Sequence, residues 1–403
     1  MTDVQLVLLK LLREIDQICE KEQIGYFLAD HTAFYAYMKN GFTGKVYEAN
    51  VLMTQEDALR FSKAVQKERR KDRALESLQT NKKMPGCYFR YTDENTLLMD
   101  LDTTYGYYQS YGIGVNIRIL QPMPKSILRK KWQAALSVGW RTMHGGRKTR
   151  LMHKALGMGV GLMMGIFGEK RVAGWLWNLA MKPAKKIDPR WYRICDAIQG
   201  LGKWVPVEIF QEAAHEQLEG NYFRICSDPQ EYLQRIYGKS WKTPRMGIPK
   251  ESYKVYADSQ LPYAYFLQAA KERHMLTKEF IRERKKFFLL DSRKGAPRKR
   301  DVVWTWNVLF RTADRFEMWC EYMPQKQELL ELYEEGQYAQ LHVKLMPYLN
   351  MLKQNYKRKL GLCFDKDIFD ITMELLRYEG EEEYAQKLIS LVPPSDYEEI
   401  HIA

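Results

Sequence analysis

Apolar residues recur at helical spacing near the start of the chain and then give way to two extended apolar runs. Over residues 3–23, one helix face carries Leu8, Leu11, Leu12, Ile15 and Cys19. We expect this helix to cover a sheet whose first two strands are Tyr26–Ala29 and Lys45–Met53. Between the two strands, the pattern predicts a short helix over Thr32–Lys39 that ends at the Asn40-Gly41 turn.

Strand and helix patterns continue to alternate as far as residue 122. A strongly charged helix is predicted over residues 54–79, and its first residues, Thr54-Gln55-Glu56-Asp57, have the pattern of a capping box. Cys87–Tyr91 and Thr96–Leu101 are separated by polar residues and predict a hairpin, and residues 112–120 predict a further strand. This interleaving predicts an α/β fold with a mixed sheet.

The middle of the chain has a different pattern. From Thr103 to Gly168 the sequence has ten Lys or Arg residues and no Asp or Glu. Apolar and basic residues alternate over residues 126–143, and residues 155–168 are uncharged, with glycine at every fourth position. We expect residues 123–199 to form a basic, amphipathic helical insertion.

Two interpretations of this insertion remain open. Helices that lie in a membrane interface place apolar and tryptophan faces among the headgroups and basic residues over anionic lipid. The residues expected to contact such a membrane are Lys130, Lys131, Trp132, Trp140, Arg147 and Lys148. The alternative is a glycine-rich helical hairpin buried in the protein, with its basic face in water. Nucleic acid is not the expected anion, because no nucleic-acid-binding signature accompanies the charge.

The last third of the chain is predicted to be mostly helical. Residues 250–300 form a predicted helical connector that ends in a basic loop, and residues 301–403 form a helical domain. Apolar positions around the Glu335-Gly336 and Glu379-Gly380 turns indicate helical hairpins similar to tetratricopeptide-type repeats. Because such hairpins usually form interaction surfaces, we expect a protein partner on these helices.

Composition and charge narrow the class of protein. The 63 basic and 50 acidic residues give a net charge of +13, which favours an anionic partner. Six scattered cysteines without a C-x-x-C pair argue against a disulfide framework or a zinc site, and for a reducing compartment. The N-terminal helix pattern is not a signal peptide, and no run reaches the roughly 20 apolar residues of a membrane span. We therefore expect a cytoplasmic protein, and the interfacial interpretation of the basic insertion places it peripherally on the inner face of the plasma membrane.

Two separated stretches of the chain carry motifs of one known family. In the first stretch the matching residues are Thr32, Gly41, Phe42, Val51, Met53, Glu56-Asp57 and Arg60-Phe61. In the second, Glu219-Gly220 leads into a helix that Asp228 caps and that ends at Tyr237-Gly238. Both stretches resemble the LicD family, which includes the fukutin-type transferases. The resemblance implies a nucleotidyltransferase-like core made of residues 1–122 and 200–247.

The resemblance also implies a reaction. LicD-type phosphotransferases move a phosphocholine or polyol-phosphate group from a CDP-linked donor to a cell-surface glycan. The glycan acceptor is a cell-envelope polymer such as teichoic acid or lipopolysaccharide, free or lipid-linked. Such chemistry needs Mg²⁺ or Mn²⁺ to neutralise the diphosphate and the charge that develops on the leaving group.

The acidic motif of the family is largely lost in this chain. The family's alternating aspartates fall on Val46, Glu48 and Asn50, and its Gly-Gly pair falls on Asp30-His31. The resemblance assigns catalysis to Glu48 and Asp30, and metal binding to Glu48, Asn50 and Asp30. One carboxylate on the strand in place of three weakens metal binding, because magnesium prefers hard, charged oxygen ligands. Asp30, at the end of the neighbouring strand, would restore a second carboxylate.

The resemblance assigns donor binding to four further positions. Arg90 matches a basic residue that contacts the donor phosphate, and Asn116 stands where the family has an aspartate. The expected donor-binding residues are therefore Thr32, His31, Arg90 and Asn116. Without the resemblance, Arg90 would be read as a surface charge and His31 as a structural histidine.

Two functions follow with equal weight. The chain is either an active but altered LicD-type transferase, or a catalytically inactive homologue that binds nucleotide or glycan, or recruits a partner. Carboxylates of Asp30 and Glu48 within about 5 Å of each other, beside an open pocket, would allow shared metal ligation. A side chain of His31, Tyr35 or Tyr37 in that space would argue against the enzyme.

Overall fold

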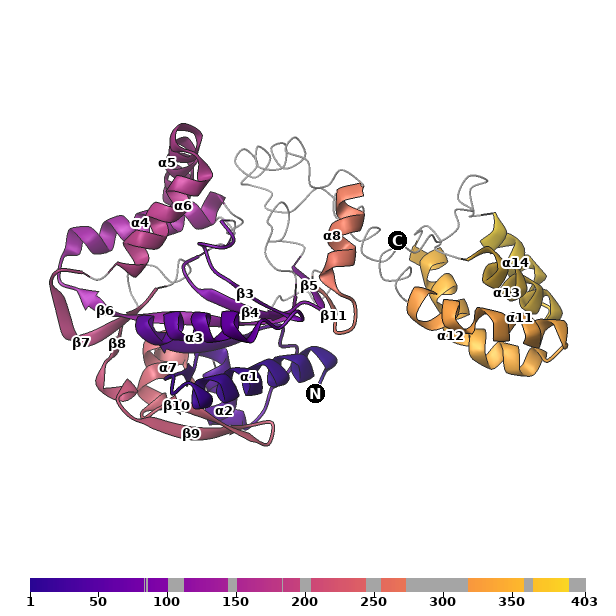
Figure 1. Cartoon of the computed structure of the whole chain (residues 1–403), viewed down its shortest axis with the longest axis horizontal. Coiled ribbons are helices and arrows are strands. Elements are labelled where there is room, and N and C mark those ends of the chain that lie inside the picture. The colour runs from indigo at the N-terminus through magenta and orange to yellow at the C-terminus, as the bar shows by residue number, and fades with distance from the viewer. Residues whose placement is uncertain are drawn as a thin grey trace. The chain divides into compact units, whose positions relative to one another are not determined.

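The computed structural model describes residues 1–82, 84, 86–100, 112–143, 151–182, 184–195, 204–243, 255–272, 318–358 and 365–390. The described residues divide into two compact units, one up to Ala264 and one from Tyr265 onward (Figure 1). The first unit holds a mixed sheet with helices, and the second is helical. The mixed α/β class predicted from the sequence is therefore confirmed.

The N-terminal helix α1 (Asp3–Lys21) forms as its apolar spacing predicts. Leu8, Leu11, Leu12, Ile15 and Cys19 are fully buried on one face. Thr2 caps the helix, since its side chain accepts from the Gln5 backbone N–H while the Gln5 side chain accepts from the Thr2 N–H. The buried face packs on helix α3 (Gln55–Glu68) and on strands β4 (Phe89–Asp93) and β6 (Gly114–Pro124) of the central sheet (Figure 1).

The central sheet has the order β1-β2-β6-β4-β3, with β7 and β8 continuing from β6. Its strands are β1 (Phe27–Leu28), β2 (Ala49–Thr54), β3 (Arg73–Glu76), β4 (Phe89–Asp93), β6 (Gly114–Pro124), β7 (Ile187–Ile194) and β8 (Trp204–Pro206). Strand β6 runs parallel to β2, whereas it is antiparallel to β4 and β7. The first half of β6 pairs with β4 and the second half with β7, so β6 lies at the centre of the sheet.

Two helices flank β2. Helix α2 (Asp30–Lys39) precedes the strand and ends at Asn40, whose φ of 51° is in the left-handed region. Helix α3 (Gln55–Glu68) follows the strand, and the Thr54 side chain accepts from the Asp57 N–H as the capping pattern predicts. The predicted helix over residues 54–79 is too long, because the chain turns at Arg69 and forms β3.

The predicted hairpin of Cys87–Tyr91 with Thr96–Leu101 does not form. Both edges of β4 are occupied, one by β3 and the other by β6. Strand β5 (Leu97–Asp100) therefore pairs with β11 (Val255–Asp258) in a separate two-stranded sheet. Strand β11 also corrects the predicted helical connector over 250–300, of which α8 (Tyr263–Glu272) is helical and residues 273–300 lie outside the described residues.

A second hairpin carries the closing motif of the first unit. Strands β9 (Ala213–Leu218) and β10 (Asn221–Cys226) are joined by Glu219-Gly220, both with positive φ (50° and 76°), as a primed hairpin turn requires. Helix α7 (Pro229–Tyr237) follows, with Asp228 as its N-cap and Gly238 at its end, as predicted. Short 3₁₀ turns cover Glu208–Phe210 and Gly238–Ser240.

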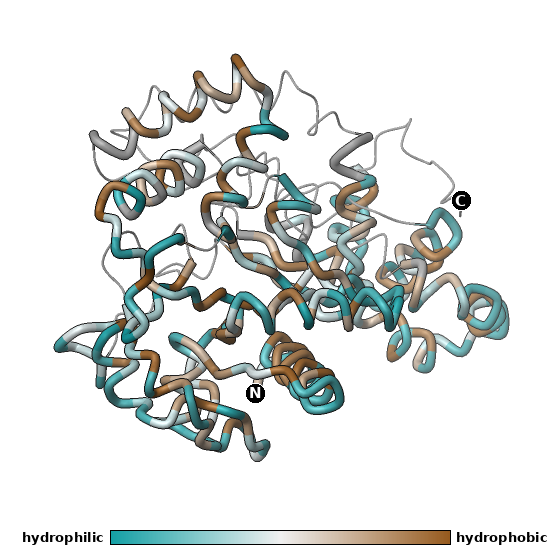
Figure 2. The backbone as a smooth tube through the Cα atoms, turned by 60° about the vertical axis from the view of Figure 1, so that its left-hand side comes forward, coloured by the Kyte–Doolittle hydropathy of each residue, from teal (hydrophilic) through white to brown (hydrophobic). Residues whose placement is uncertain are grey.

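Three helices interrupt the sheet between β6 and β7. They are α4 (Ile127–Met143), α5 (Leu151–Phe167) and α6 (Glu169–Met181), which we call the three-helix segment. The predicted insertion over 123–199 is helical in this part, but β6 continues to Pro124 and β7 returns to pair with it, because the second half of β6 has a free edge there. No helix among the described residues is long and apolar enough to cross a membrane. Figure 2 shows apolar and small residues along α5, at the top of the view.

Within residues 318–358 and 365–390, the second unit has four helices in two hairpins, and most of α8 also belongs to this unit. The four helices are α11 (Lys326–Glu334), α12 (Tyr338–Arg358), α13 (Lys366–Tyr378) and α14 (Glu382–Ile389), preceded by a π-helical turn, Met318–Tyr322, and a 3₁₀ turn, Met323–Gln325. The predicted Glu-Gly turns join each pair, and Gly336 and Gly380 have φ of 67° and 83°, which favour glycine. Leu329, Leu341 and Phe369 belong to a core of this unit's own.

Candidate functional site

Strands β2, β6 and β4 bring three of the predicted site positions together. The sheet register places Asn50 on β2 beside Asn116 on β6, and Asn116 beside Arg90 on β4. The Asn116 amide donates from Nδ2 to Glu48 Oε2 (3.1 Å) and to Asn50 Oδ1 (3.2 Å). Its Oδ1 accepts from Arg90 Nη1 (3.1 Å). Asn116 therefore links the remaining acid of the motif to the predicted phosphate-binding arginine.

The segment that leads into α2 lies against the same point of β2. The Ala29 N–H donates to the Asn50 carbonyl (2.9 Å), and the Asn50 N–H donates to Thr32 Oγ1 (2.9 Å). Asp30 has a φ of 48°, a left-handed conformation that glycine adopts freely and that aspartate tolerates better than most residues. Its N–H donates to the Tyr232 hydroxyl on α7 (3.1 Å). The backbone thus has a glycine-like shape where the resemblance places the family's Gly-Gly pair.

The Asp30 carboxylate is paired with an arginine that sequence reasoning missed. Arg118 Nη1 lies 2.7 Å from Asp30 Oδ2, and the two residues are only 8% and 3% exposed. Arg118 follows Asn116 by two residues on β6, so both side chains project from the same face of the strand. This period-two spacing within the predicted strand was the available signal. The sequence does not show which acid the arginine meets, because the pair forms between distant segments.

Glu48 is ionised within this group. Burial raises the pKa of its carboxyl, but electrostatic interactions with His31, Arg90 and Arg118 and the hydrogen bond from Asn116 lower it by more, so the pKa lies below the ordinary value. The side chain is half-buried just before β2 begins. Glu48 is therefore a carboxylate at neutral pH whose charge is already compensated by neighbouring cations.

The imidazole of His31 occupies the space beside Asn50. His31 Nε2 lies 2.8 Å from the Glu48 carbonyl oxygen, to which it donates, and both ring nitrogens lie 3.3 Å from Asn50 Nδ2. An edge-to-face contact with Tyr35, at 6.1 Å between ring centroids, holds the imidazole from the other side. Tyr35 itself is buried. By the criterion derived from the sequence, a histidine in this position argues against an open metal pocket.

The chemistry of the donor set does not fit magnesium or manganese. Mg²⁺ binds through carboxylate, phosphate and water oxygens in a near-ideal octahedron. Asp30 is paired with Arg118, Glu48 is held by Asn116 among cations, and Val46 is apolar and buried. Among the described residues, no three or more His, Cys, Asp or Glu side chains are grouped where a metal ion could be held. We therefore derive no step through a metal at this site.

The predicted membrane-contact residues separate into different environments. Trp132 is 55% exposed and Lys131 is exposed. Trp140 is fully buried and donates from its indole nitrogen to the Met84 carbonyl (2.8 Å), so its assignment as a membrane contact is wrong. It lies two helical turns beyond Trp132, where α4 meets the core. The side chain of Lys130, and Arg147 and Lys148 as a whole, lie outside the described residues.

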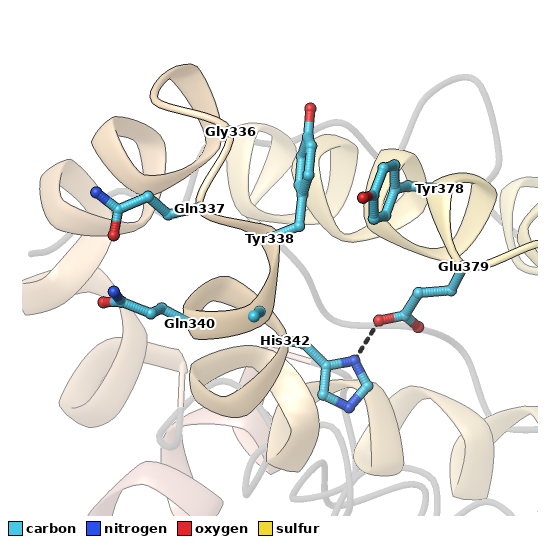
Figure 3. A pocket seen from close by; sticks show the side chains of 8 residues that line it. Gly336, Gln337, Tyr338, Gln340, His342, Tyr378 and Glu379 are labelled. Atoms are coloured by element: carbon cyan, nitrogen blue, oxygen red, sulfur yellow. Dashed lines mark hydrogen bonds and ion pairs between the residues drawn. The ribbon is translucent and has the colours of Figure 1, made fainter.

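The helical unit has a pocket of its own, which sequence reasoning did not locate. It measures about 770 Å³ and is lined by Gly336, Gln337, Tyr338, Ala339, Gln340, His342, Tyr378 and Glu379. The rings of Tyr338 and Tyr378 stack with centroids 4.3 Å apart. Figure 3 shows the His342 imidazole facing the Glu379 carboxylate, and His342 Nδ1 is hydrogen-bonded to this carboxylate. The two Glu-Gly turns were the signal, because the pocket lies beside both of them.

Comparison with known proteins adds no family to these observations. No model of a protein family matches the chain, and no curated protein matches its sequence. The LicD-like assignment therefore stays a prediction that depends on the two matching stretches.

Proposed function

We propose that this protein is a LicD-like homologue that binds the diphosphate of a CDP-linked ligand without transferring its phospho-substituent. The observation that carries the proposal is the hydrogen bonding of Asn116, which joins Glu48, Asn50 and Arg90 into one network. An amide at this position satisfies its neighbours with hydrogen bonds, whereas a carboxylate there would add the negative charge that attracts a metal ion.

The loss of transfer follows from electrostatics. Phosphoryl-type transfer needs positive charge on the diphosphate and on the departing oxygen, which transferases of this kind obtain from a divalent cation. Arg90 and Arg118 lie close enough to Glu48 to lower its pKa, and they would repel a dication at the same point. The imidazole of His31 also fills the side of Asn50 on which a ligand oxygen would otherwise stand.

Retention of binding follows from the same cations. Arg90 is buried, and its Nε has no hydrogen-bond partner, while its other nitrogens bond to Asn116 and to the Gly112 carbonyl. A buried guanidinium with a spare donor suits a phosphate oxygen. The N-terminus of α2, beside Thr32, adds the positive end of a helix dipole next to the network.

The proposed place of action is the cytoplasm, with the protein peripheral on the inner face of the plasma membrane and close to a lipid-linked glycan. Exposed apolar and basic side chains on the three-helix segment support this location. The pocket with stacked tyrosines in the helical unit supports the recruitment of a protein partner.

Calorimetry with CDP-choline tests the proposal. We expect the wild-type protein to bind with the same affinity in Mg²⁺ and in EDTA. Arg90→Ala should weaken binding about ten- to hundredfold, because a hydrogen bond to a charged group is lost. Arg90→Lys should recover part of it. Arg235→Ala, which removes an exposed arginine on α7, is the matched control and should bind as wild type does. Absence of binding to the wild type would contradict the proposal.

An active transferase is the second candidate, and one observation favours it. Two carboxylates, Asp30 and Glu48, remain near Arg118, and Asp30 Oδ1 is buried without a hydrogen-bond partner. Release of CMP and phosphocholine from CDP-choline in Mg²⁺, with water as the acceptor in place of the glycan, tests this candidate. Magnesium-dependent cleavage that disappears in Glu48→Ala would support the transferase, whereas an equally slow background in both proteins would leave binding as the function.

A further inference from the structure

Large apolar side chains are exposed in unusual number on the three-helix segment. Those more than 40% exposed are Ile127, Leu128, Trp132, Met158, Leu162, Ile166, Phe167 and Trp175. Single exposed apolar residues are ordinary on protein surfaces, but a contiguous patch marks a site of interaction with a protein, a ligand or a membrane.

The exposed side chains of α5 form one stripe. Met158, Leu162 and Ile166 are four residues apart, so they lie one above another on the same face of the helix. No charged residue interrupts residues 155–168. At the end of the stripe, the ring of Phe167 contacts the ring of Trp175 on α6, with centroids 5.1 Å apart. The stripe thus continues from α5 onto α6.

A groove extends this surface between the helices. It has a volume of about 450 Å³, and its walls include Trp132 and Leu136 of α4, Met163 of α5, and Trp175 and Leu179 of α6. Arg129 and Lys182 also line it and are neighbours, because the Arg129 guanidinium donates to the Lys182 backbone carbonyl. An apolar channel with adjacent basic residues in its wall matches an acyl chain that carries an anionic headgroup.

Basic side chains surround the apolar surface. The exposed ones are Lys125, Lys131, Lys170, Arg171, Lys182, Lys185 and Lys186. The acidic residue of the segment, Glu169, is half-buried at the start of α6. The charge of this surface therefore complements an anionic bilayer, which attracts basic residues near its surface.

The segment is attached to the core by residues other than those of the apolar surface. Trp140 donates to the Met84 carbonyl, and the Trp177 ring packs edge-to-face on Phe89 of β4 at 5.6 Å. Trp132 and Trp175, in contrast, are 55% and 43% exposed. Tryptophans exposed in this way are suited to a membrane interface, because one end of the ring is apolar and the other polar.

We propose that the three-helix segment docks on an anionic phospholipid bilayer, with one acyl chain in the groove and its phosphate over Arg129 and Lys182. The stripe on α5 enters the headgroup region in the plane of the membrane, and the surrounding lysines contact neighbouring anionic headgroups. This inference deepens the membrane location of the proposed function and rests on that location. It does not depend on nucleotide binding at Asn116.

Flotation with vesicles tests the docking. The full-length protein is expected to float with phosphatidylglycerol–phosphatidylcholine vesicles and not with phosphatidylcholine alone. Leu162→Glu/Ile166→Glu should lower the bound fraction at least about tenfold, because two charges would enter the interface. Val343→Glu on α12, where the native side chain is 72% exposed, is the matched control and should float as wild type does.

Three results would overturn the docking. The first is a wild-type protein that stays at the bottom of the gradient in low salt. The second is equal flotation of the double variant. The third is that a DNA duplex or another protein competes with vesicles for the protein, and that this competing binding is unchanged by the Leu162→Glu/Ile166→Glu substitution. A different partner would then occupy the surface.

Quenching by brominated acyl chains tests the groove. Vesicles with bromine near the middle of the chain should quench the fluorescence of the wild-type protein, and Trp132→Phe/Trp175→Phe should remove most of that quenching while flotation persists. Quenching that survives in the double variant would refute the placement of a chain in the groove. A protein that floats normally but does not bind CDP-choline would contradict the proposed ligand site and leave the docking intact. A protein that binds CDP-choline but does not float would contradict the docking and leave the ligand site intact.

Discussion

The buried polar residues around Asn116, which we call the Asn116 cluster, and the three-helix segment depart from ordinary burial in opposite directions. In the Asn116 cluster, the side chains that are at most 8% exposed are Asp30, Thr32, Asn50, Arg90, Asn116 and Arg118. On the three-helix segment, Leu128 and Leu162 are 79% and 67% exposed. The first region keeps polar side chains in the interior through hydrogen bonds and an ion pair, and the second leaves apolar side chains in water.

The two departures carry different energetic consequences. A buried polar group stabilises the fold only while its partner remains, so substitutions in the Asn116 cluster should reduce stability. An exposed apolar group contributes little to folding, so substitutions on the outer face of the helices should change binding and not stability. Stability and binding measurements can therefore separate a region that maintains the fold from one that serves a partner.

The largest expected effect compares two tryptophans of the same helix. Trp140→Ala should lower the free energy of unfolding by about 3–5 kcal/mol, because it empties a buried site and leaves the Met84 carbonyl without its donor. Trp132→Ala should change it by less than about 0.5 kcal/mol. Urea denaturation followed by circular dichroism measures both. Similar losses in the two variants would show that the outer face also supports the fold.

The next effect concerns the ion pair between Asp30 and Arg118. Asp30→Asn keeps the shape of the side chain but removes the negative charge 2.7 Å from the buried Arg118, and should destabilise the protein by about 1–3 kcal/mol. Thermal unfolding of Asp30→Asn and of Asp228→Asn, a substitution in an exposed helix cap, separates this effect from a general loss of charge. An Asp30→Asn protein as stable as wild type would mean that the pair adds nothing to the fold.

Acid should destabilise the region around Asn116 once the pH is low enough to protonate Glu48. Glu48 has a lowered pKa in the folded state, so it stabilises the fold at neutral pH, and this contribution is lost as the pH falls through the folded pKa. Glu48→Gln should be less stable than wild type by about 1 kcal/mol at pH 7 and equal to it in strong acid. Chemical denaturation from pH 7 to pH 3 checks this. A constant difference between the two proteins would contradict the assignment.

The smallest effect is expected on the outer stripe of α5. Leu162→Glu should change the free energy of unfolding by no more than about 0.5 kcal/mol, since the native side chain is 67% exposed. The same denaturation experiment used for Trp140→Ala measures it. A loss near 2 kcal/mol would place Leu162 in a packed interface of the folded protein and remove it from the docking surface.

Local pattern was sufficient for elements whose shape depends on their own residues. The apolar spacing of α1, the cap at Thr54 and the cap at Asp228 all appear where the sequence predicts them. Each depends on residues within one or two helical turns. The helical character of the second unit was predictable for the same reason, because Gly336 and Gly380 end helices locally.

Competition between distant segments was not visible in the sequence. Strand β5 has a good strand pattern, but the neighbour it seemed to need, β4, is already paired on both edges. The charges of Asp30 and Arg118 are far apart in the chain, and their pairing depends on how β6 aligns with β2. Trp132 and Trp140 share a helix and a stripe, so periodicity could not tell which one meets the core.

One backbone contact gives the three-helix segment an unusual independence. The Lys125 N–H donates to the Lys186 carbonyl (3.0 Å), and the pairing of β6 with β7 begins at the adjacent residues, Pro124 and Ile187. The chain therefore leaves the sheet and re-enters it at neighbouring positions, in the manner of a hairpin with a very long connection. A short engineered turn from Lys125 to Lys186 would preserve the ladder of both strands. Genetic removal of the three helices would thus give a shortened protein, in which the part of the core now covered by Trp140 becomes exposed.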